Sequence, residues 1–306
     1  MTDLGFDRPL YILPFDHRGS FQSGLFGWKG TLTSEQTERV AASKAIIYDG
    51  LLAAVAAGVE QARAGILVDE QFGAEILRDA RAQGYITACP AEKSGQNEFD
   101  FEYGDKFREH IAEFKPTFIK ALVRYNPEDD EAMNRRQAAR LKLLADYAHE
   151  NAQYFMFELL VPMTKDQHER MEGDQHLYDL HLRPSLMIAA IKELQGLGVE
   201  PDVWKIEGLD RREDAAAVAA ATRHDGRDKV GCILLGRGSN EAGIIAWLQA
   251  AAPLPAYIGF AVGRTSFWDA LAGQRDGKIS RDQAVADIAG RYTKWVKTFE
   301  EARKAA

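Results

Sequence analysis

Residues 201–208 read PDVWKIEG, and Lys205 places a charge in the middle of this apolar run. A buried parallel strand normally consists of near-continuous hydrophobic residues, and an ammonium group inside one is costly unless a neighbouring group compensates. Burial and a nearby second cation both lower the pKa of a lysine, so that its amine can be neutral near neutral pH and attack a carbonyl carbon to form a Schiff base. The position of Lys205 therefore predicts a catalytic amine.

Two more charges interrupt apolar runs, Lys120 in KPTFIKALVRYN (115–126) and Glu158 in QYFMFELLVP (153–162). If these runs and the run around Lys205 enclose one interior, Lys120 would lower the pKa of Lys205. Glu158 would then transfer protons during carbinolamine formation and carbon–carbon cleavage. The alternative is an internal ion-pair network that only fixes the packing. Buried ion pairs are weak stabilisers, which favours the catalytic interpretation.

Alternation along these strands brings two more polar residues into consideration. Lys120 shares a face with Arg124, and Lys205 shares a face with Glu207. We expect Arg124 to bind substrate. Glu207 is better explained as the partner of a neighbouring cation than as a catalytic acid.

The elements that must position these residues are eight short β-type runs with helix-type segments between them. The runs are PLYILPFD (9–16), AGILVDE (64–70), YITACP (85–90), KPTFIKALVRYN (115–126), QYFMFELLVP (153–162), PDVWKIEG (201–208), DKVGCILLGRG (228–238) and AYIGFAVGR (256–264). Helices are expected at 34–57, 72–84, 129–151 and 186–198 and at the end of the chain. Eight strand–helix units predict an α/β protein, a single-domain (β/α)8 TIM barrel over residues 1–306, with an open doubly wound sheet as the alternative.

In such a barrel the active site lies at the carboxyl ends of the strands, and most of the predicted strands end in polar residues. These residues are Asp16, His17 and Arg18, Asp69 and Glu70, Glu92 and Lys93, Arg124 and Asn126, and the glycine–arginine turns after strands seven and eight. A single polar residue at a strand end can be a solvated or capping group. Their recurrence around the barrel predicts a substrate site.

The two glycine–arginine turns predict where an anion binds. Gly236, Arg237 and Gly238 follow the seventh strand, and Gly263 and Arg264 follow the eighth. Glycine allows the backbone to approach an anion closely, the following helix supplies N–H donors, and arginine adds a forked cation. Loops after strands seven and eight are the usual phosphate site of this barrel. Neither loop contains a nucleotide-binding glycine motif.

Composition excludes several other classes. The chain has 306 residues, 46% of them hydrophobic, and a formal net charge of −8 with a pI near 5.5, so it has no general attraction for nucleic acid. No stretch has the roughly 20 apolar residues of a membrane span, and the first residues do not look like a secretory signal. We therefore expect a cytoplasmic protein with no membrane partner, whose cysteines, Cys89 and Cys232, are reduced core residues.

A catalytic metal is not expected from the histidine spacing. The segment HERMEGDQHLYDLH contains His168, His176 and His181, but the intervals of eight and five residues match no usual ligand pattern. The predicted lysine chemistry also needs no cofactor, because the covalent Schiff base takes that role.

Long motifs resemble a known family. They are LYILPFDHRGSF, GILVDEQFGAEILRDA, TACPAEKSGQ, FEYGDKF, LVRYNPE, FELLVP, PDVWKIEGLDRRED, KVGCILLGRG and IGFAVGRTSFWD. Together they resemble the C-terminal domain of bacterial IolC-type proteins, in which a 5-dehydro-2-deoxygluconokinase is fused to a 2-deoxy-5-keto-gluconate 6-phosphate aldolase of myo-inositol breakdown. The resemblance runs from about residue 8 to about residue 300. The pattern is more distantly similar to class I tagatose-1,6-bisphosphate and sulfofructose-phosphate aldolases.

This resemblance implies a role for individual residues. Lys205 matches the Schiff-base lysine on strand six, Lys120 the strand-four lysine beside it, and Glu158 the strand-five acid. The substrate-binding positions implied are Asp16 and Arg18 after strand one, Asp69 and Glu70 after strand two, Gly236 and Gly238 after strand seven, and Gly263 and Arg264 after strand eight. Two positions depart from the distant relatives: His17, where they more often have glutamine, and Arg237, an added arginine that could bind a second anion such as a carboxylate.

The resemblance implies a class I aldolase that cleaves 2-deoxy-5-keto-gluconate 6-phosphate to dihydroxyacetone phosphate and malonate semialdehyde. Another phosphoketose, including a tagatose or sulfofructose phosphate, and transaldolase action on the same Schiff base are alternatives within the same chemistry. A non-catalytic sugar-phosphate-binding barrel is the alternative from another class. Related barrels often assemble, so a homo-oligomer is expected.

Overall fold

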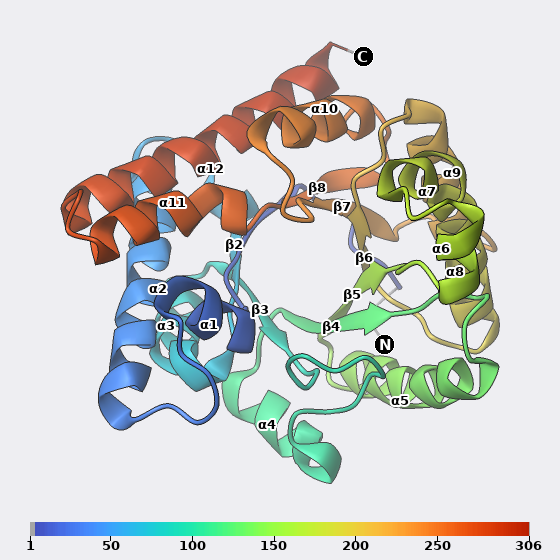
Figure 1. Cartoon of the computed structure of the whole chain (residues 1–306), viewed down its shortest axis with the longest axis horizontal. Helices are drawn as coiled ribbons and strands as arrows, with labels where there is room; N and C mark the ends of the chain where they lie inside the picture. The colour runs from blue at the N-terminus through green and yellow to red at the C-terminus, as the bar shows by residue number, and fades with distance from the viewer. Residues whose placement is uncertain (1–3, 306) are drawn as a thin grey trace.

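A computed structural model, which describes residues 4–305, has eight parallel strands in a closed barrel with helices around it (Figure 1). The strands are β1 (Leu10–Pro14), β2 (Ala64–Leu67), β3 (Ile86–Pro90), β4 (Phe118–Arg124), β5 (Tyr154–Leu160), β6 (Val203–Glu207), β7 (Gly231–Leu235) and β8 (Tyr257–Ala261). Each strand pairs with its neighbours in chain order, and β8 pairs with β1. The predicted (β/α)8 barrel is confirmed, and the open sheet is excluded.

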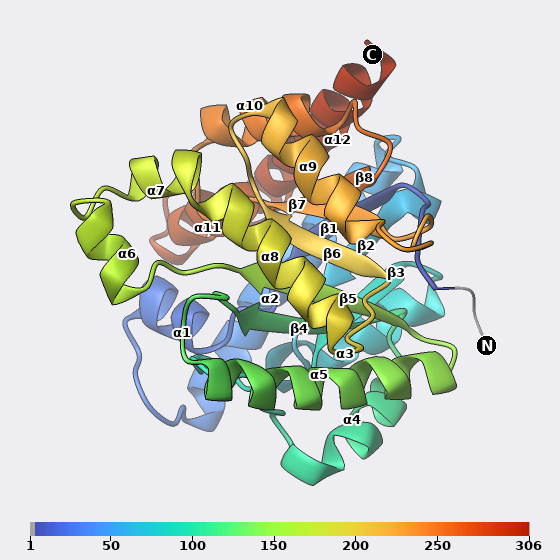
Figure 2. The same cartoon turned by 90° about the vertical axis from the view of Figure 1, so that its right-hand side faces the viewer.

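Helices cover the outside of the barrel and the loops at one end of it (Figures 1 and 2). They are α1 (Gly19–Phe26), α2 (Ser34–Ala56), α3 (Glu70–Ala82), α4 (Phe107–Phe114), α5 (Glu131–Glu150), α6 (Lys165–Arg170), α7 (Gln175–His181), α8 (Arg183–Gly196), α9 (Arg212–Thr222), α10 (Glu241–Ala251), α11 (Arg264–Arg275) and α12 (Arg281–Lys304). The five predicted helices correspond to α2, α3, α5, α8 and, at the end of the chain, α12. None of these helices within residues 4–305 is long and apolar enough to cross a membrane.

Helix α1 lies in a segment for which the sequence predicted no helix. Phe21 and Leu25 are one turn apart on α1 and are both buried. The ring of Phe21 lies 6.1 Å from that of Phe267 on α11. Contact with a distant helix therefore stabilises this short helix, and a local pattern does not reveal that contact.

The barrel interior is divided into an apolar layer and a charged layer. Phe118 of β4, Met156 of β5 and Val203 of β6 belong to the apolar cluster that fills the amino-terminal half of the barrel. Phe6 closes this end, with its ring 5.0 Å from that of Phe118. Two residues further along the same strands, on the same face, come their charged residues. The apolar layer thus forms a dry floor beneath them.

Candidate active site

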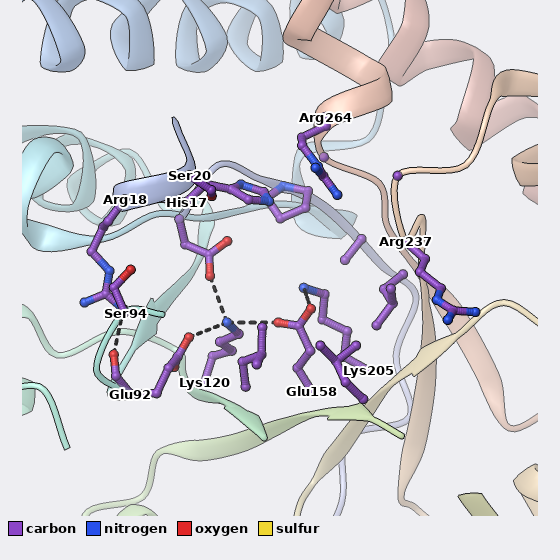
Figure 3. Close-up of a pocket in the computed structure, with 18 of the residues that line it drawn as sticks. His17, Arg18, Ser20, Glu92, Ser94, Lys120, Glu158, Lys205, Arg237 and Arg264 are labelled. Carbon is purple, nitrogen blue, oxygen red and sulfur yellow. Dashed lines mark hydrogen bonds and ion pairs between the residues drawn. The ribbon is translucent and has the colours of Figure 1, made fainter. Parts of the chain in front are cut away.

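A cavity of about 590 Å³ opens at the carboxyl ends of the strands (Figure 3). It is lined by most of the residues that the sequence analysis selected: Asp16, Arg18, Lys120, Arg124, Glu158, Lys205, Gly236, Arg237, Gly238, Gly263 and Arg264. His17, Glu92 and Lys93 line it as well. The polar strand ends therefore converge on one cavity, as expected for this fold.

Glu158 bridges the two buried lysines at the bottom of the cavity. Its Oε1 lies 2.7 Å from Lys205 Nζ, and its Oε2 lies 2.9 Å from Lys120 Nζ. The β5–β6 register places Glu158 directly opposite Lys205. The lysines are only 4% and 1% exposed, so a proton transferred between Lys205 and Glu158 is shielded from bulk water.

Lys120 is held much more tightly than Lys205. Its Nζ lies 2.8 Å from Asp16 Oδ2 and 2.6 Å from Glu92 Oε1, in addition to its contact with Glu158 (Figure 3). Burial opposes its charge, but Asp16, Glu158 and Glu92 together raise the pKa of Lys120 well above its usual value. Lys120 is therefore a fixed cation. Lys205, which contacts a single carboxylate among the described residues, is the amine with greater freedom to react.

The carboxylates of the cluster differ in their electrostatic environments. Burial acts to raise the pKa of both Asp16 and Glu158, but Lys120 and Lys205 outweigh it and lower both pKa values. At Glu92 burial prevails over Lys120 and Arg18, so the pKa of its carboxyl is raised. Glu92 Oε2 is buried without a hydrogen-bond partner among residues 4–305. Glu92 is thus the carboxyl of this group best suited to hold a proton.

Arg18 fixes the loop that carries Glu92. Its Nη2 donates to the Glu92 carbonyl oxygen at 2.6 Å, and its Nη1 lies 3.0 Å from Glu102 Oε2. Both contacts join the end of β1 to the loop after β3. Arg18 therefore shapes the cavity wall with two of its nitrogens, while its position on the lining still gives it access to a substrate.

His17 lies between the lysine cluster and the glycine–arginine turns. Burial lowers the pKa of His17 to about 4, and Lys205 and Arg264 add to this effect although Asp16 opposes it. Its Nδ1 is buried and has no hydrogen-bond partner in the described part of the chain. A neutral imidazole with an unused nitrogen can donate to or accept from a substrate oxygen.

The turn after β8 presents a cationic, nitrogen-rich surface to the cavity. Arg264 is the first residue of α11, and no described side chain caps this helix terminus. A Cβ added to Gly238 would lie 2.8 Å from Arg264 Nη2, and one added to Gly263 would lie 2.7 Å from the carbonyl oxygen of Pro14. The backbone contact makes Gly263 necessary for close packing, whereas Gly238 is favoured by its left-handed φ of 71°. Arg264 forms no ion pair within residues 4–305, which leaves its guanidinium available for an anion.

Arg237 is already paired, unlike Arg264. Its Nη1 lies 2.6 Å from Asp179 Oδ2 and its Nε lies 2.8 Å from Glu207 Oε1. The expectation that Glu207 supports a neighbouring cation is confirmed by this contact. The structure does not support the interpretation of Arg237 as the site of a second anion, because two carboxylates already neutralise it. Its role is to hold the loop after β7 against α7.

Asp69 and Glu70 are the predicted site residues that the structure does not bring to the cavity. Asp69 is fully buried, pairs with Lys44 and caps α3 by accepting from the Phe72 N–H. Glu70 points toward Cys89, outside the barrel strands. Strand β2 ends two residues before Asp69, and the chain turns directly into α3, so these carboxylates lie behind the cavity wall. Arg124 does reach the cavity, where its Nη1 donates to the Gln96 carbonyl oxygen at 2.7 Å.

The structure is a (β/α)8 barrel with a charged cavity at the carboxyl ends of its strands, and comparison with known proteins adds a family. The chain belongs to the family described as "Uncharacterized protein conserved in bacteria (DUF2090)", which matches residues 6–303. No match was found among curated proteins. The family assignment therefore covers the whole barrel without specifying a reaction.

Solved structures of fructose-bisphosphate aldolases share the fold. The Plasmodium falciparum enzyme, solved with TRAP and an inhibitor, is similar with a TM-score of 0.63 and 13% identity over 94% of this chain and 90% of that one. The Slackia heliotrinireducens enzyme is similar with a TM-score of 0.55 and 14% identity, and the match covers 92% of this chain and 86% of that one. A Schiff-base-forming fructose-1,6-bisphosphate aldolase has a TM-score of 0.52 and 12% identity, and the match covers 92% of this chain and 93% of that one. At these identities the likeness establishes the fold alone.

Proposed function

We propose that the protein is a class I, metal-independent aldolase in which Lys205 forms a Schiff base with a phosphorylated keto sugar acid. The observation that carries the proposal is the buried contact between Lys205 and Glu158, 2.7 Å apart at the bottom of a cavity. A shielded amine with a single carboxylate as its proton acceptor is what nucleophilic attack on a ketone requires. Simple binding of a sugar phosphate would not require it.

The reaction sequence uses the residues of the cluster in turn. Lys205 transfers its proton to Glu158 and attacks the ketone carbon. Glu158 then returns this proton to the carbinolamine hydroxyl, which leaves as water to give an iminium and a deprotonated Glu158. Glu158 then accepts the proton of the hydroxyl on the carbon to be cleaved, and the bonding electrons move into the iminium to form an enamine. Lys120 remains charged and stabilises the anionic groups around it. Protonation of the enamine and hydrolysis regenerate the amine.

The substrate class follows from the charges around the cavity. Arg264 and the uncapped α11 terminus suit one phosphate, next to the ketone that Lys205 attacks. The proposed substrate is 2-deoxy-5-keto-gluconate 6-phosphate, as in the IolC-type proteins that the motifs resemble. Attack at its C5 ketone and cleavage between C3 and C4 would give dihydroxyacetone phosphate and malonate semialdehyde.

Borohydride trapping tests the mechanism. The protein is incubated with dihydroxyacetone phosphate, reduced with sodium borohydride and digested, and the modified peptide is located by mass spectrometry. We expect one stable adduct on Lys205 and none in Lys205→Arg. Lys93→Gln, a substitution of an exposed lysine at the cavity rim, should label like the wild type. Absence of an adduct on Lys205 would leave a non-catalytic barrel as the better explanation.

A panel of substrates tests the second part of the proposal. Cleavage of 2-deoxy-5-keto-gluconate 6-phosphate is measured beside that of tagatose and sulfofructose phosphates. A Lys205 adduct combined with preferred cleavage of a different phosphoketose would retain the Schiff-base chemistry but refute the assigned substrate.

A further inference from the structure

A second cluster of chemically active side chains lies behind the cavity wall. Glu70 at the start of α3, Cys89 on β3 and His110 on α4 bring their ligand atoms within 4.8 Å of one another. None of them lines the catalytic cavity. Cys89 packs with the hydrophobic residues between the barrel and its helices. The aldolase mechanism proposed above does not use this cluster.

The two distances from Glu70 fit a tetrahedral metal ion, and the Cys89 and His110 ligand atoms lie within 4.8 Å of each other. Glu70 Oε2 lies 3.4 Å from His110 Nε2 and 3.7 Å from Cys89 Sγ. Zinc binds nitrogen and oxygen at about 2.0 Å and sulfur at about 2.3 Å, so a tetrahedral site separates an oxygen and a nitrogen ligand by about 3.3 Å and an oxygen and a sulfur ligand by about 3.5 Å. Small side-chain adjustments would therefore place all three atoms on one ion.

The buried, unpaired ring nitrogens of His110 also indicate a ligand. His110 is 8% exposed, yet neither of its ring nitrogens has a hydrogen-bond partner among residues 4–305. Buried polar groups are nearly always satisfied, because leaving one unpaired is costly. Nε2 lies near Glu70 but outside hydrogen-bonding geometry. Coordination of an ion would satisfy this nitrogen.

Tyr103 covers the cluster from the solvent side. Its hydroxyl donates to Glu70 Oε1 at 2.7 Å, which fixes the carboxylate and leaves Oε2 directed at the other two residues. Its ring lies 4.3 Å from the His110 ring. A group that orients a ligating carboxylate in this way is typical of the outer shell of metal sites.

We propose that Glu70, Cys89 and His110 bind one Zn²⁺ ion, with a water molecule as the fourth ligand. Glutamate, cysteine and histidine are all usual zinc ligands. On binding, the Cys89 thiol becomes a thiolate and its proton passes to the buffer, so that one proton is released for each zinc ion and affinity falls as the pH falls. The ion would tie α3, β3 and α4 together outside the cavity and would take no part in the Schiff-base chemistry.

Zinc titration of the whole protein tests the proposal. The protein is treated with a chelator, desalted and titrated with Zn²⁺ in competition with a chromophoric chelator, and proton release is measured in a weak buffer. We expect one tight site per chain and one proton released. His110→Gln should weaken binding by at least roughly 100-fold. Cys89→Ser should also weaken it and abolish the proton release.

The matched control is Cys232→Ser, at the other buried cysteine, whose sulfur lies 3.4 Å from Thr222 Oγ1 and far from this cluster in the barrel. It should bind zinc like the wild type. Circular dichroism without metal shows whether each variant is folded, and zinc should raise the Tm of the wild type and Cys232→Ser but not that of folded His110→Gln. No stoichiometric binding by the wild type, or equal binding by wild type and His110→Gln, would overturn the site.

Discussion

At the scale of single residues, the two buried lysines of the site differ in the number of carboxylates that neutralise them. Within residues 4–305, Lys120 contacts three carboxylates, whereas Lys205 contacts one. Alternation along a strand could predict which residues share a face with each lysine and with Glu158, but the sequence left it conditional whether these faces point into the barrel. It could not show that Glu158 lies between the two lysines, since that depends on the register of β4, β5 and β6. The difference between the fixed and the reactive lysine arises from that register.

His17 makes a testable contribution to the pH dependence of stability. Its pKa falls from 6.5 to about 4 on folding, so between these values the unfolded chain binds a proton that the folded protein does not. The free energy of unfolding must therefore decrease as the pH falls from 6.5 toward 4, and His17 contributes no pH dependence above this window. Converting the pKa difference gives up to about 3 kcal/mol, which contact with solvent reduces to about 1–2 kcal/mol.

Urea unfolding of wild type and His17→Gln at several pH values measures this contribution. The variant should lose about 0.5–1 kcal/mol less stability than the wild type between pH 7 and pH 5, which is about half of the full window. His224→Gln, at a histidine whose side chain is 58% exposed, serves as the control and should follow the wild-type profile. Parallel profiles for wild type and His17→Gln would refute the buried, neutral state of His17.

At the scale of elements, the strands were predictable and several connecting segments were not. All eight strands follow from apolar runs, and the glycine–arginine turns were correctly assigned to the cavity. The acidic end of strand two was assigned to the cavity by the same rule but lies behind it, because Asp69 caps α3 and pairs with Lys44. A capping residue and a substrate-binding residue at a strand end have the same local sequence. Only the contact with a residue distant in the chain, here Lys44, distinguishes the capping role from the substrate-binding role.

The two arginines on adjacent loops allow a test of the anion site. Arg264 is unpaired among the described residues, whereas Arg237 is paired with Asp179 and Glu207. Arg264→Gln should raise the KM for a phosphorylated substrate roughly 10- to 100-fold, because charged hydrogen bonds contribute about 1.5–3 kcal/mol. The same variant should bind an unphosphorylated analogue as the wild type does.

Arg237→Gln is the matched comparison for this experiment. It should change the KM by less than threefold or so but lower the stability by about 1–3 kcal/mol, because Glu207 is left buried without its nearest cation. Steady-state kinetics and urea unfolding of both variants separate the two roles. A larger KM effect in Arg237→Gln than in Arg264→Gln would place the phosphate on the loop after β7 instead.

At the scale of the whole molecule, the cavity exists because the barrel closes over a dry floor. The apolar layer below the lysines excludes water from one side, so the ion pairs above it act in a low-dielectric setting. This layer is continuous only if β8 pairs with β1. Closure of the barrel and the reactivity of Lys205 are thus linked, although Leu10 and Gly259 of the seam do not line the cavity.

Gly259 is the residue on which this closure depends most directly. It pairs with Leu10 across the β8–β1 seam, and a Cβ at Gly259 would lie 1.7 Å from the Leu10 carbonyl oxygen. The three atoms nearest to this Cβ all belong to the Leu10 backbone, so no flexible side chain could move away. Gly259→Ala should therefore lower the free energy of unfolding by at least about 3 kcal/mol, through separation of the seam.

Gly290→Ala provides the control for this change, because a Cβ at Gly290 meets nothing within 4 Å and the residue lies inside α12. This substitution should raise stability by about 0.5–1 kcal/mol, since alanine favours the helix and restricts the unfolded chain. Urea unfolding of both variants gives the comparison.

If the seam controls the site, Gly259→Ala that remains folded should also trap less borohydride adduct on Lys205, while Gly290→Ala traps the wild-type amount. Equal stability of the two variants would show that β1 can shift to accept a side chain, and the floor beneath the lysines would then not depend on this contact.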